Sequence, residues 1–467
     1  MNNESLDLFL QQKGVELTEE QYNYVYDVCF GETPVDNWSV AGSGKSLCLE
    51  LIKEFLGDSC VVVAMTGAAN SNLFNCKGGN GTFNSVMSIP LGIHNHYHEK
   101  KVSPKTRDIF SKSDIVRVVI VEEAGMMNPD QLSLFHKRIL QYNKPYGKKR
   151  KRRNIKIVLQ GDHLQLGSIS SDEEKEYYIK TYGSDFLPES SIYKELGFNT
   201  HIFSKVMRTS DKTFQAALGV MRYGEEQRYD KCIRWLNQRF QKAPDNCLVV
   251  TTTNKKVEEM NERELAKNPN QLFELTPIIR DDYDIKDCPV DAVVRVKVGS
   301  PVLILVNDNE ENKYHNGSYG HVTQICVGEG VYVRLALNDE EVFVPMFKYE
   351  AREYYTDTNK ETGEDFMNQR VIGECHHYSI KLASAISVHR CQGKTLDVPY
   401  LLDLGWGFNP RQDIDWGMQL AYVGWSRATK FENVYLASPM THKHLKVNER
   451  AVKWVKTVLR GCNEKDK

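Results

Sequence analysis

The chain has 467 residues and a mass of 53.6 kDa, which is long for one hydrophobic core and predicts about three domains. Hydrophobic residues make up 41% and charged residues 26%, a globular composition that argues against disordered and fibrous proteins. Sixty basic and 62 acidic residues give a net charge of −2, so a polyanionic partner would have to meet a local basic patch.

Neither secretion nor membrane insertion is expected. No apolar run approaches about 18 residues, and the first residues lack the basic and apolar regions of a signal peptide. The 11 cysteines are scattered without a C-x-x-C pair, which predicts reduced thiols rather than a disulfide framework or a zinc site. We therefore expect a soluble intracellular protein, and the sequence leaves the choice between cytoplasm and nucleus open.

Short apolar runs alternate with amphipathic helical patterns in the first and last parts of the chain. The runs are too short for anything but buried strands, and we expect strands at 61–65, 116–121, 155–160, 248–252, 400–404 and 434–437. The helical patterns between them lie at 46–56, 131–141, 213–222, 255–266 and 418–429. This alternation is typical of an α/β fold with parallel, doubly wound sheets.

Residues 292–378 break that rhythm. Short β-like stretches alternate there with Gly-Ser, Asn-Asp and Asn-Gly-Ser turns, which predicts a small antiparallel β-barrel inserted into an α/β domain. Within this region, residues 349–370 are rich in Glu, Asp, Thr, Lys and Tyr, and we expect them to form a surface excursion.

The stretch SVAGSGKS, Ser39 to Ser46, is typical of a phosphate-binding loop ahead of a helix. Gly42 and Gly44 would let backbone N–H groups turn toward a phosphate chain at the positive end of the helix dipole. Lys45 would supply a charge for the β and γ phosphates, and Ser46 a hydroxyl for Mg²⁺. The full consensus has glycine at the first position, where this chain has Ser39.

Polar groups follow two further expected strands. VVIVEEAG places Glu122 and Glu123 at the carboxyl end of one strand, where ligands bind in doubly wound sheets. One carboxylate would hold Mg²⁺ and the other would polarise the attacking water, although a pair of glutamates at a helix start is an alternative. The third strand ends in QGDHLQLGS, with Asp162 and Gln165 at the same edge.

Taken together, these motifs resemble superfamily 1 helicases of the 5′→3′ branch, which contains RecD, the phage helicase Dda and the Pif-type helicases. The resemblance covers roughly residues 15–437, and the motifs occur in the family's order. The matching segments are Met65–Asn70 (motif Ia), Thr82–Ser85 (Ib), Glu122–Glu123 (II), Gly161–Gln165 (III), Val206–Arg208 (IV), Ala383–Asp397 (V) and Ala421–Thr429 (VI).

The resemblance implies a role for each matching residue. The implied catalytic groups are Lys45, the water-activating Glu123, the γ-phosphate sensor Gln165 and the arginine fingers Arg208 and Arg427. The implied nucleotide contacts are the adenine-reading Gln21 together with Ala41, Gly42, Ser43, Gly44, Lys45, Ser46 and Gly393. The implied ligands of Mg²⁺ are Ser46 and Glu122. The implied contacts to DNA are Thr66, Thr82, Asn84, Ser387 and His389.

Three departures from the family pattern matter: Ser39 in place of glycine, Glu122 in place of the shorter aspartate, and Gly167-Ser168 in place of prolines. Glu122 matters most, because an extra methylene shifts a carboxylate by about 1.5 Å against the strict geometry of Mg²⁺. Structural interpretations also stay open. Arg208 could cap a helix, Arg427 could pair with Asp415 or Glu432, and His389 could be a packed polar residue.

Several segments carry weaker signals. The basic run at 148–153 is expected to be a solvated loop, with phosphate contact and a nuclear address as alternatives. His94, His96 and His98 alternate as in a strand and do not predict a metal site. Residues 90–112 would be either the strand-separating hairpin of the family or a plain surface loop.

The resemblance implies two RecA-like domains, residues 1–205 with a small insertion near 86–113, and residues 206–291 with 379–467, separated by the barrel at 292–378. The implied activity is an ATP-dependent DNA helicase that moves 5′→3′ on single-stranded DNA in replication, recombination or repair. ATP and Mg²⁺ would be the cofactors. Single-stranded, tailed or forked DNA, and replication or recombination proteins, would be partners of a monomer. A DNA-binding ATP switch, or a motor subunit of a larger complex, is the alternative.

Overall fold

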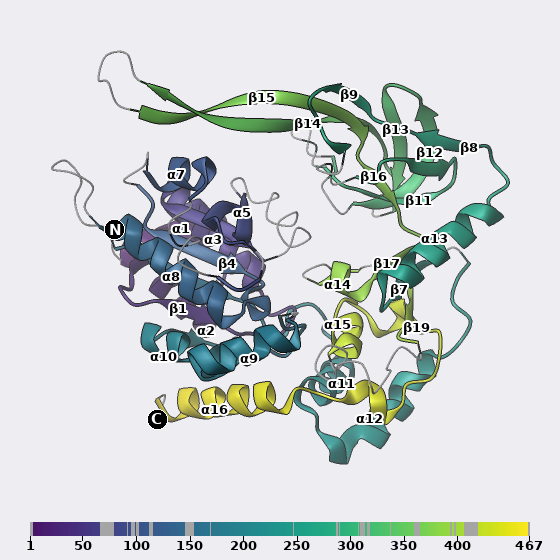
Figure 1. Cartoon of the computed structure of the whole chain (residues 1–467). Coiled ribbons are helices and arrows are strands. Elements are labelled where there is room, and N and C mark those ends of the chain that lie inside the picture. Colours follow the sequence, from purple (N-terminus) through teal and green to yellow (C-terminus); the bar gives the residue numbers. More distant parts are fainter. Residues whose placement is uncertain are drawn as a thin grey trace.

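The computed structural model describes residues 3–65, 79–90, 92–94, 99, 102–111, 115–144, 154–168, 170–245, 247–285, 288, 290–306, 308, 313–314, 318–336, 338–358, 365–392, 395–396, 398–405 and 419–465. The described residues form two parallel sheets, one large antiparallel sheet and a two-stranded antiparallel ribbon (Figure 1). All cysteines in the described part are free thiols, as expected from their spacing. No helix in that part is both long and apolar enough to cross a bilayer.

The first sheet is parallel, with the strand order β3-β2-β4-β5-β1-β6. Its strands are β1 (Val35–Asn37), β2 (Cys60–Ala64), β3 (Gly79–Thr82), β4 (Val118–Glu122), β5 (Lys156–Gln160) and β6 (Asn199–His201). From β1 the chain crosses to β2 and β3 at one edge of the sheet. It then comes back through β4 and β5, which lie between β2 and β1, and ends in β6 on the other side of β1. A doubly wound sheet binds ligands at the carboxyl ends of its strands near such a reversal.

Alternate residues of the central strands bury opposite faces of this sheet. Val61 and Val63 of β2 join one core, whereas Val62 and Ala64 join the other. Both faces are covered by helices, so each strand reads as a continuous apolar run. Helices that follow the chain through this unit are α1 (Asn3–Lys13), α2 (Glu19–Phe30), α3 (Lys45–Leu56), α5 (Phe83–Met87), α7 (Pro104–Ser111), α8 (Pro129–Asn143), α9 (Asp172–Tyr182) and α10 (Ser191–Leu196).

The second parallel sheet has the order β17-β7-β18-β19. Its strands are β7 (Leu248–Thr251), β17 (Ala385–Ser387), β18 (Tyr400–Asp403) and β19 (Val434–Leu436). The accompanying helices are α11 (Lys212–Tyr223), α12 (Tyr229–Leu236), α13 (Asn254–Lys267), α14 (Val388–Cys391) and α15 (Leu420–Trp425). The α/β class with two parallel sheets is therefore confirmed. The exact domain limits given above stay a prediction.

The inserted region is antiparallel, as predicted, but its strands pair as an open sheet in the described residues. The order is β16-β11-β12-β13-β14-β15-β9, which leaves β16 and β9 as edges, and β8 pairs with β10 in a separate ribbon. The expected barrel closure is thus not confirmed. These strands are β8 (Leu272–Leu275), β9 (Ile278–Asp281), β10 (Val294–Lys297), β11 (Pro301–Ile304), β12 (Tyr319–Cys326), β13 (Gly330–Leu335), β14 (Glu341–Thr358), β15 (Asp365–Tyr378) and β16 (Ile380–Leu382).

The expected surface excursion at 349–370 takes the form of the far part of a long hairpin. Strands β14 and β15 pair from Met346↔Tyr378 to Thr358↔Asp365, with an irregularity between Ala351 and Arg352. Figure 1 shows this two-stranded ribbon projecting beyond the other strands of the antiparallel sheet. Its strand state comes from backbone pairing across the hairpin and not from an apolar pattern in the sequence.

Two helices lie in the described part of the segment between β3 and β4. Helices α5 and α7 occupy part of residues 83–111, so residues 104–111 do not form one arm of a strand-separating hairpin. His94 lies in this segment and contacts Asp130 through its ring Nδ1 (3.0 Å) and its backbone N–H (2.7 Å). His96, His98 and the basic run at 148–153 lie outside the described residues.

The last helix, α16 (Glu449–Lys465), follows the second sheet in the chain but packs on the first unit. Ala451, Val452 and Val455 form a small core with Leu164, and Figure 1 shows α16 running alongside α9. Arg450 at its start donates to Asp185 (2.8 Å) and Glu189 (2.7 Å). Residues 202–211 therefore connect the first half of the chain to the second, and α16 packs back against the first half.

Candidate active site

The loop between β1 and α3 has the conformation that the SVAGSGKS motif predicts. Gly42 (φ 73°) and Gly44 (φ 91°) adopt left-handed backbone conformations, and α3 begins at Lys45. A Cβ atom on Gly42 would lie 2.5 Å from Cβ of Arg208, and one on Gly44 would lie 2.5 Å from Nε2 of Gln21. Glycine is thus required at both positions by backbone angle and by close neighbours.

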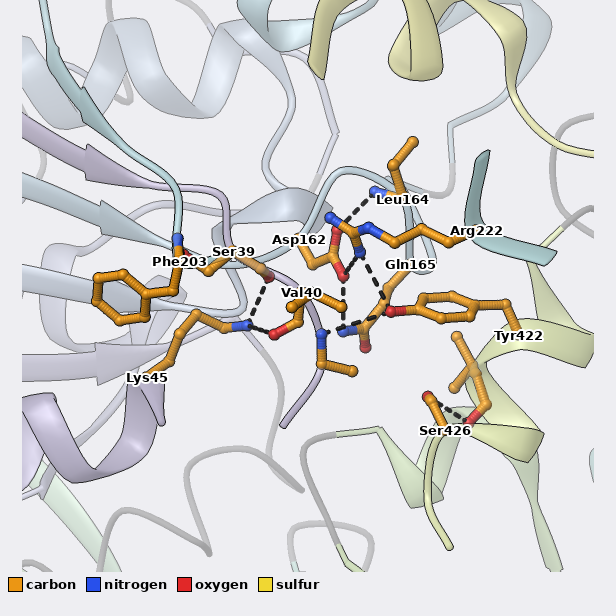
Figure 2. Close-up of polar contacts among 12 residues, drawn as sticks. Ser39, Val40, Lys45, Asp162, Leu164, Gln165, Phe203, Arg222, Tyr422 and Ser426 are labelled. Atoms are coloured by element: carbon orange, nitrogen blue, oxygen red, sulfur yellow. Dashed lines mark hydrogen bonds and ion pairs between the residues drawn. The ribbon is translucent and has the colours of Figure 1, made fainter. Parts of the chain in front are cut away.

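Lys45 and Gln21 both contact this loop. The Lys45 ammonium donates to the carbonyl oxygens of Ser39 (2.7 Å) and Val40 (3.1 Å), and burial lowers its pKa (Figure 2). Gln21 forms a capping box with Thr18 at the start of α2, and its Nε2 donates to the carbonyl of Ser43 (2.9 Å). These contacts position both side chains against the loop that would hold phosphates.

Ser39, the departure from the glycine consensus, fits this loop without strain. Its φ is not positive, and its buried hydroxyl donates to Oδ1 of Asn37 while accepting the backbone N–H of Phe203 (2.6 Å). Further along, the N–H groups of Met207 (2.7 Å) and Arg208 (3.1 Å) donate to the carbonyl of Gly42. Residues 203–208 are therefore hydrogen-bonded along the phosphate-binding loop.

Glu122 ends β4 beside the first turn of α3, as the sequence predicted. Gln160 at the end of β5 bridges the two, because its Nε2 donates to Oε2 of Glu122 (3.1 Å) and to the carbonyl of Lys45 (3.3 Å). The hydroxyl of Tyr24 donates to Oε1 of Gln160 (2.7 Å). Burial and the neighbouring Glu123 carboxylate raise the pKa of Glu122 to about 7.

These donors fit a magnesium ion. Glu122 offers one carboxylate, and Ser46 in the first turn of α3 offers an exposed hydroxyl. No cluster of three or more His, Cys, Asp or Glu side chains that could cage a metal occurs among the described residues. Mg²⁺ is usually bound by one or two such oxygens plus phosphates and water, so a sparse hard-oxygen set is the expected one.

Glu123 has a left-handed backbone conformation (φ 56°), which is uncommon outside glycine and occurs often at functional sites. Its Oε2 accepts a hydrogen bond from Nε2 of Gln392 (3.0 Å). Gln392 follows α14 of the second sheet, so this contact joins the two parallel sheets. The sequence analysis named the segment containing Gln392 but assigned this residue no role.

Gln165 is buried at the same edge and held by Asp162. The Asp162 carboxylate accepts the backbone N–H of Leu164 (3.0 Å) and Nε2 of Gln165 (3.2 Å) (Figure 2). Oε1 of Gln165 is buried and has no hydrogen-bond partner in the described part of the chain. The amide therefore has its acceptor end available.

Arg208 and Arg427 lie close together, one from each side of the interface. The guanidinium of Arg208 donates to the carbonyl of Ser426 (2.5 Å), and burial together with the charge of Arg427 lowers its pKa to about 9. Arg427 is 1% exposed and donates to the carbonyls of Val423 (3.0 Å) and Cys391 (3.4 Å). Helix α15 ends at Trp425, so Arg427 lies just beyond it and not within the expected helix 418–429.

Comparisons with known proteins agree with this arrangement, although no protein-family model matches the chain. The chain is 23% identical over 383 residues to the Pif1 helicase of Campylobacter jejuni, covering 76% of this chain and 80% of that protein. It is 27% identical over 351 residues to the RRM3 helicase of Saccharomyces cerevisiae, covering 71% of this chain and 46% of that protein.

Solved structures share the whole fold. Pif1 from Bacteroides in complex with ADP-AlF4 has a TM-score of 0.72 and 23% identity, covering 96% of this chain and 98% of that one. The Bacteroides protein bound to single-stranded DNA has a TM-score of 0.70 and 24% identity, with the same coverage. The chain is thus similar in sequence and in fold to Pif1-type helicases.

In this chain the expected DNA contacts lie at two helix starts, one on each parallel sheet. Thr82 precedes α5, and Nδ2 of the following Asn84 is buried without a hydrogen-bond partner in the described residues. Ser387 precedes α14, whose second residue is His389, and burial lowers the pKa of His389. Thr66 and Gly393 lie outside the described residues.

Two polar residues of the interface were not predicted from the sequence, Arg222 of α11 and Tyr422 of α15. Arg222 is paired with Asp162 and also donates to the hydroxyl of Tyr422 (3.2 Å). A signal was present, since Arg222 follows Phe214 and Leu218 at a spacing of four on one helix face. An arginine on a buried face requires a buried acceptor.

Proposed function

We propose that this chain is an ATP-dependent DNA helicase that moves along single-stranded DNA, 5′→3′, and separates the duplex ahead of it. The observation that carries the proposal is the meeting of Arg208 and Arg427 beside the phosphate-binding loop. The two guanidinium groups repel one another, and burial together with the charge of Arg427 disfavours the charged form of Arg208. A polyphosphate bound to the loop would supply the negative charge that this arrangement favours.

The proposed roles follow from the geometry at the sheet edge. The loop and Lys45 would bind the β and γ phosphates, with Gln21 positioned for the base. Ser46 and Glu122 would hold Mg²⁺, which neutralises charge on the phosphates when it is bound. Glu123 would accept the proton of the attacking water, and Gln165 would orient that water.

Arg208 and Arg427 would stabilise the charge that develops during phosphoryl transfer. Arg208 belongs to the connecting segment, which is hydrogen-bonded to the phosphate-binding loop of the first unit, whereas Arg427 follows α15 of the second unit. Closure of the cleft is therefore needed to complete the site. This requirement couples hydrolysis to a movement between the two parallel sheets.

Single-stranded DNA is proposed as the track. The candidate contacts Thr82 and Asn84 belong to the first sheet unit, whereas Ser387 and His389 belong to the second. A change in the spacing of the two sheets would shift one pair of contacts relative to the other along a strand. Contacts of this kind go to phosphates and carry affinity without sequence information. Each base-pair step costs only about 1.4 kcal/mol to open.

The test is a steady-state ATPase assay with and without single-stranded DNA, followed by strand displacement on tailed duplexes. We expect strong stimulation by DNA, unwinding from 5′ tails, and loss of both activities in Lys45→Ala with the fold retained. Hydrolysis without stimulation by DNA would instead support an ATP switch. Efficient unwinding from 3′ tails alone would assign the chain to the opposite polarity.

A further inference from the structure

The most deeply buried ion pair among the described residues joins the two parallel sheet units. Arg222 of α11 donates through Nη1 to Oδ2 of Asp162, and the two side chains are 1% and 0% exposed (Figure 2). The Nε and Nη2 atoms of Arg222 have no partner in the described residues. Burial would lower the pKa of the guanidinium, but the Asp162 carboxylate outweighs burial and raises it. Asp162 is therefore the group that allows this charge to be buried.

The same carboxylate oxygen that binds Arg222 also holds Gln165. Oδ2 of Asp162 accepts from Nη1 of Arg222 and from Nε2 of Gln165 (3.2 Å). An ionised carboxylate can only accept, so the Gln165 amide must turn its nitrogen toward Asp162. Its Oε1, which has no partner in the described residues, is then oriented to accept a hydrogen bond. A glutamine that orients attacking water needs that acceptor end free.

Arg222 also reaches the phosphate-binding loop through Tyr422. The Tyr422 hydroxyl accepts from Nη1 of Arg222 (3.2 Å) and from the backbone N–H of Ala41 (3.4 Å). Arg222 and Tyr422 both come from helices of the second sheet unit, α11 and α15. Ala41 and Asp162 both come from the first. One side chain of the second unit thus contacts the sensor loop and, through Tyr422, the phosphate loop.

We propose that Arg222 is a positioning residue for ATP hydrolysis, which holds Gln165 in its water-orienting rotamer through Asp162 only while the two sheet units are together. The inference rests on the proposed function. It makes the sensor dependent on the second unit, because an opened interface removes the cation that shares Oδ2 of Asp162 with Gln165. Arg222 does not touch the reacting atoms.

The test compares Arg222→Met, which keeps the volume and removes the charge, with the parent. We expect the DNA-stimulated kcat to fall by about 10²-fold, the scale of a misplaced catalytic group, while KM for ATP changes less than about twofold. Arg222→Lys retains the charge but cannot contact Asp162 and Tyr422 at the same time. Its kcat should therefore lie between that of the parent and that of Arg222→Met. Adding Asp162→Asn to Arg222→Met should cause little further loss, because both changes break the same link.

Arg450→Met is the control. Like Arg222→Met, it replaces an arginine that pairs with a carboxylate of the first unit, but Arg450 lies in α16 and does not touch Asp162. It should leave kcat and KM near those of the parent. An Arg222→Met protein with parental kcat, or an additive loss in the double variant, would overturn the inference. If Arg222→Met does not fold, Arg222→Lys decides, and a parental kcat overturns the proposal. A parent that DNA fails to stimulate would refute the proposed function itself, which keeps the two failures distinct.

Discussion

Replacing Ser39 by the consensus glycine should destabilise this protein. The Ser39 hydroxyl accepts the buried N–H of Phe203 (2.6 Å) and donates to Asn37, and the residue is 0% exposed. Without the hydroxyl, the Phe203 N–H loses its acceptor inside the protein, at a cost of about 1–3 kcal/mol. Ser39→Ala should lose that amount. Ser39→Gly should lose a further ~0.4–1 kcal/mol, because glycine is freer in the unfolded chain.

The effect on nucleotide binding should be much smaller than the effect on stability. Lys45 contacts the backbone carbonyl of Ser39, which both substitutions retain. We therefore expect KM for ATP to change less than about twofold, well under the tenfold change that about 1.4 kcal/mol would produce. Guanidinium titration measures the stability change, and steady-state ATPase kinetics measure KM.

Ser190→Ala is the control for this experiment. Ser190 is equally buried, and its hydroxyl donates to the carbonyl of Leu187 (2.6 Å) and caps α10, away from the phosphate-binding loop. It should lose comparable stability with no change in ATP kinetics. If Ser39→Gly is as stable as the parent, the hydrogen bond between the Phe203 N–H and the Ser39 hydroxyl does not contribute to stability, and this prediction is wrong.

Three further outcomes are expected. Glu123→Gln should bind ATP but hydrolyse it slowly, whereas Glu122→Asp should keep or raise activity; a dead Glu122→Asp with a normal Glu123→Gln would reverse the two roles. Arg427→Ala should lower kcat by about 10³ or more with little change in nucleotide affinity, and DNA should stimulate it weakly; weakened binding with normal stimulation would make Arg427 a ground-state clamp. Burial, and after it the charge of Arg222, lowers the pKa of His163 to about 3 in the folded protein. The pKa of a histidine in the unfolded chain is ~6.5. As the pH falls, the unfolded state therefore takes up the proton first, and the folded state loses stability. This histidine should therefore lower the free energy of unfolding by about 2 kcal/mol between pH 7 and pH 5. His163→Phe keeps an aromatic ring stacked on Trp38 and should remove that loss. Denaturant titrations at the two pH values measure the difference. An unchanged pH dependence would show that His163 takes up its proton equally in the folded and unfolded states and would contradict this prediction.

The central strands and the phosphate-binding loop could be predicted from local sequence. Strands such as Val118–Val121 are buried on both faces, so consecutive residues are apolar and the strand can be recognised from the sequence. The glycine pattern of SVAGSGKS likewise specifies its own backbone turn. β1, β6 and β17 could not be found in this way, because each has three residues and is held in place by neighbouring strands.

The sequence by itself determined which chemical groups stand at the ends of the strands, because strand and motif are contiguous in the chain. Only the tertiary structure decided which distant groups meet. Arg222 and Asp162 are 60 residues apart, and Glu123 and Gln392 are 269 apart. No local pattern records such pairs. They exist because residues 202–211 and α16 bring the second unit against the first, where a buried charge must find its counterion or an acceptor.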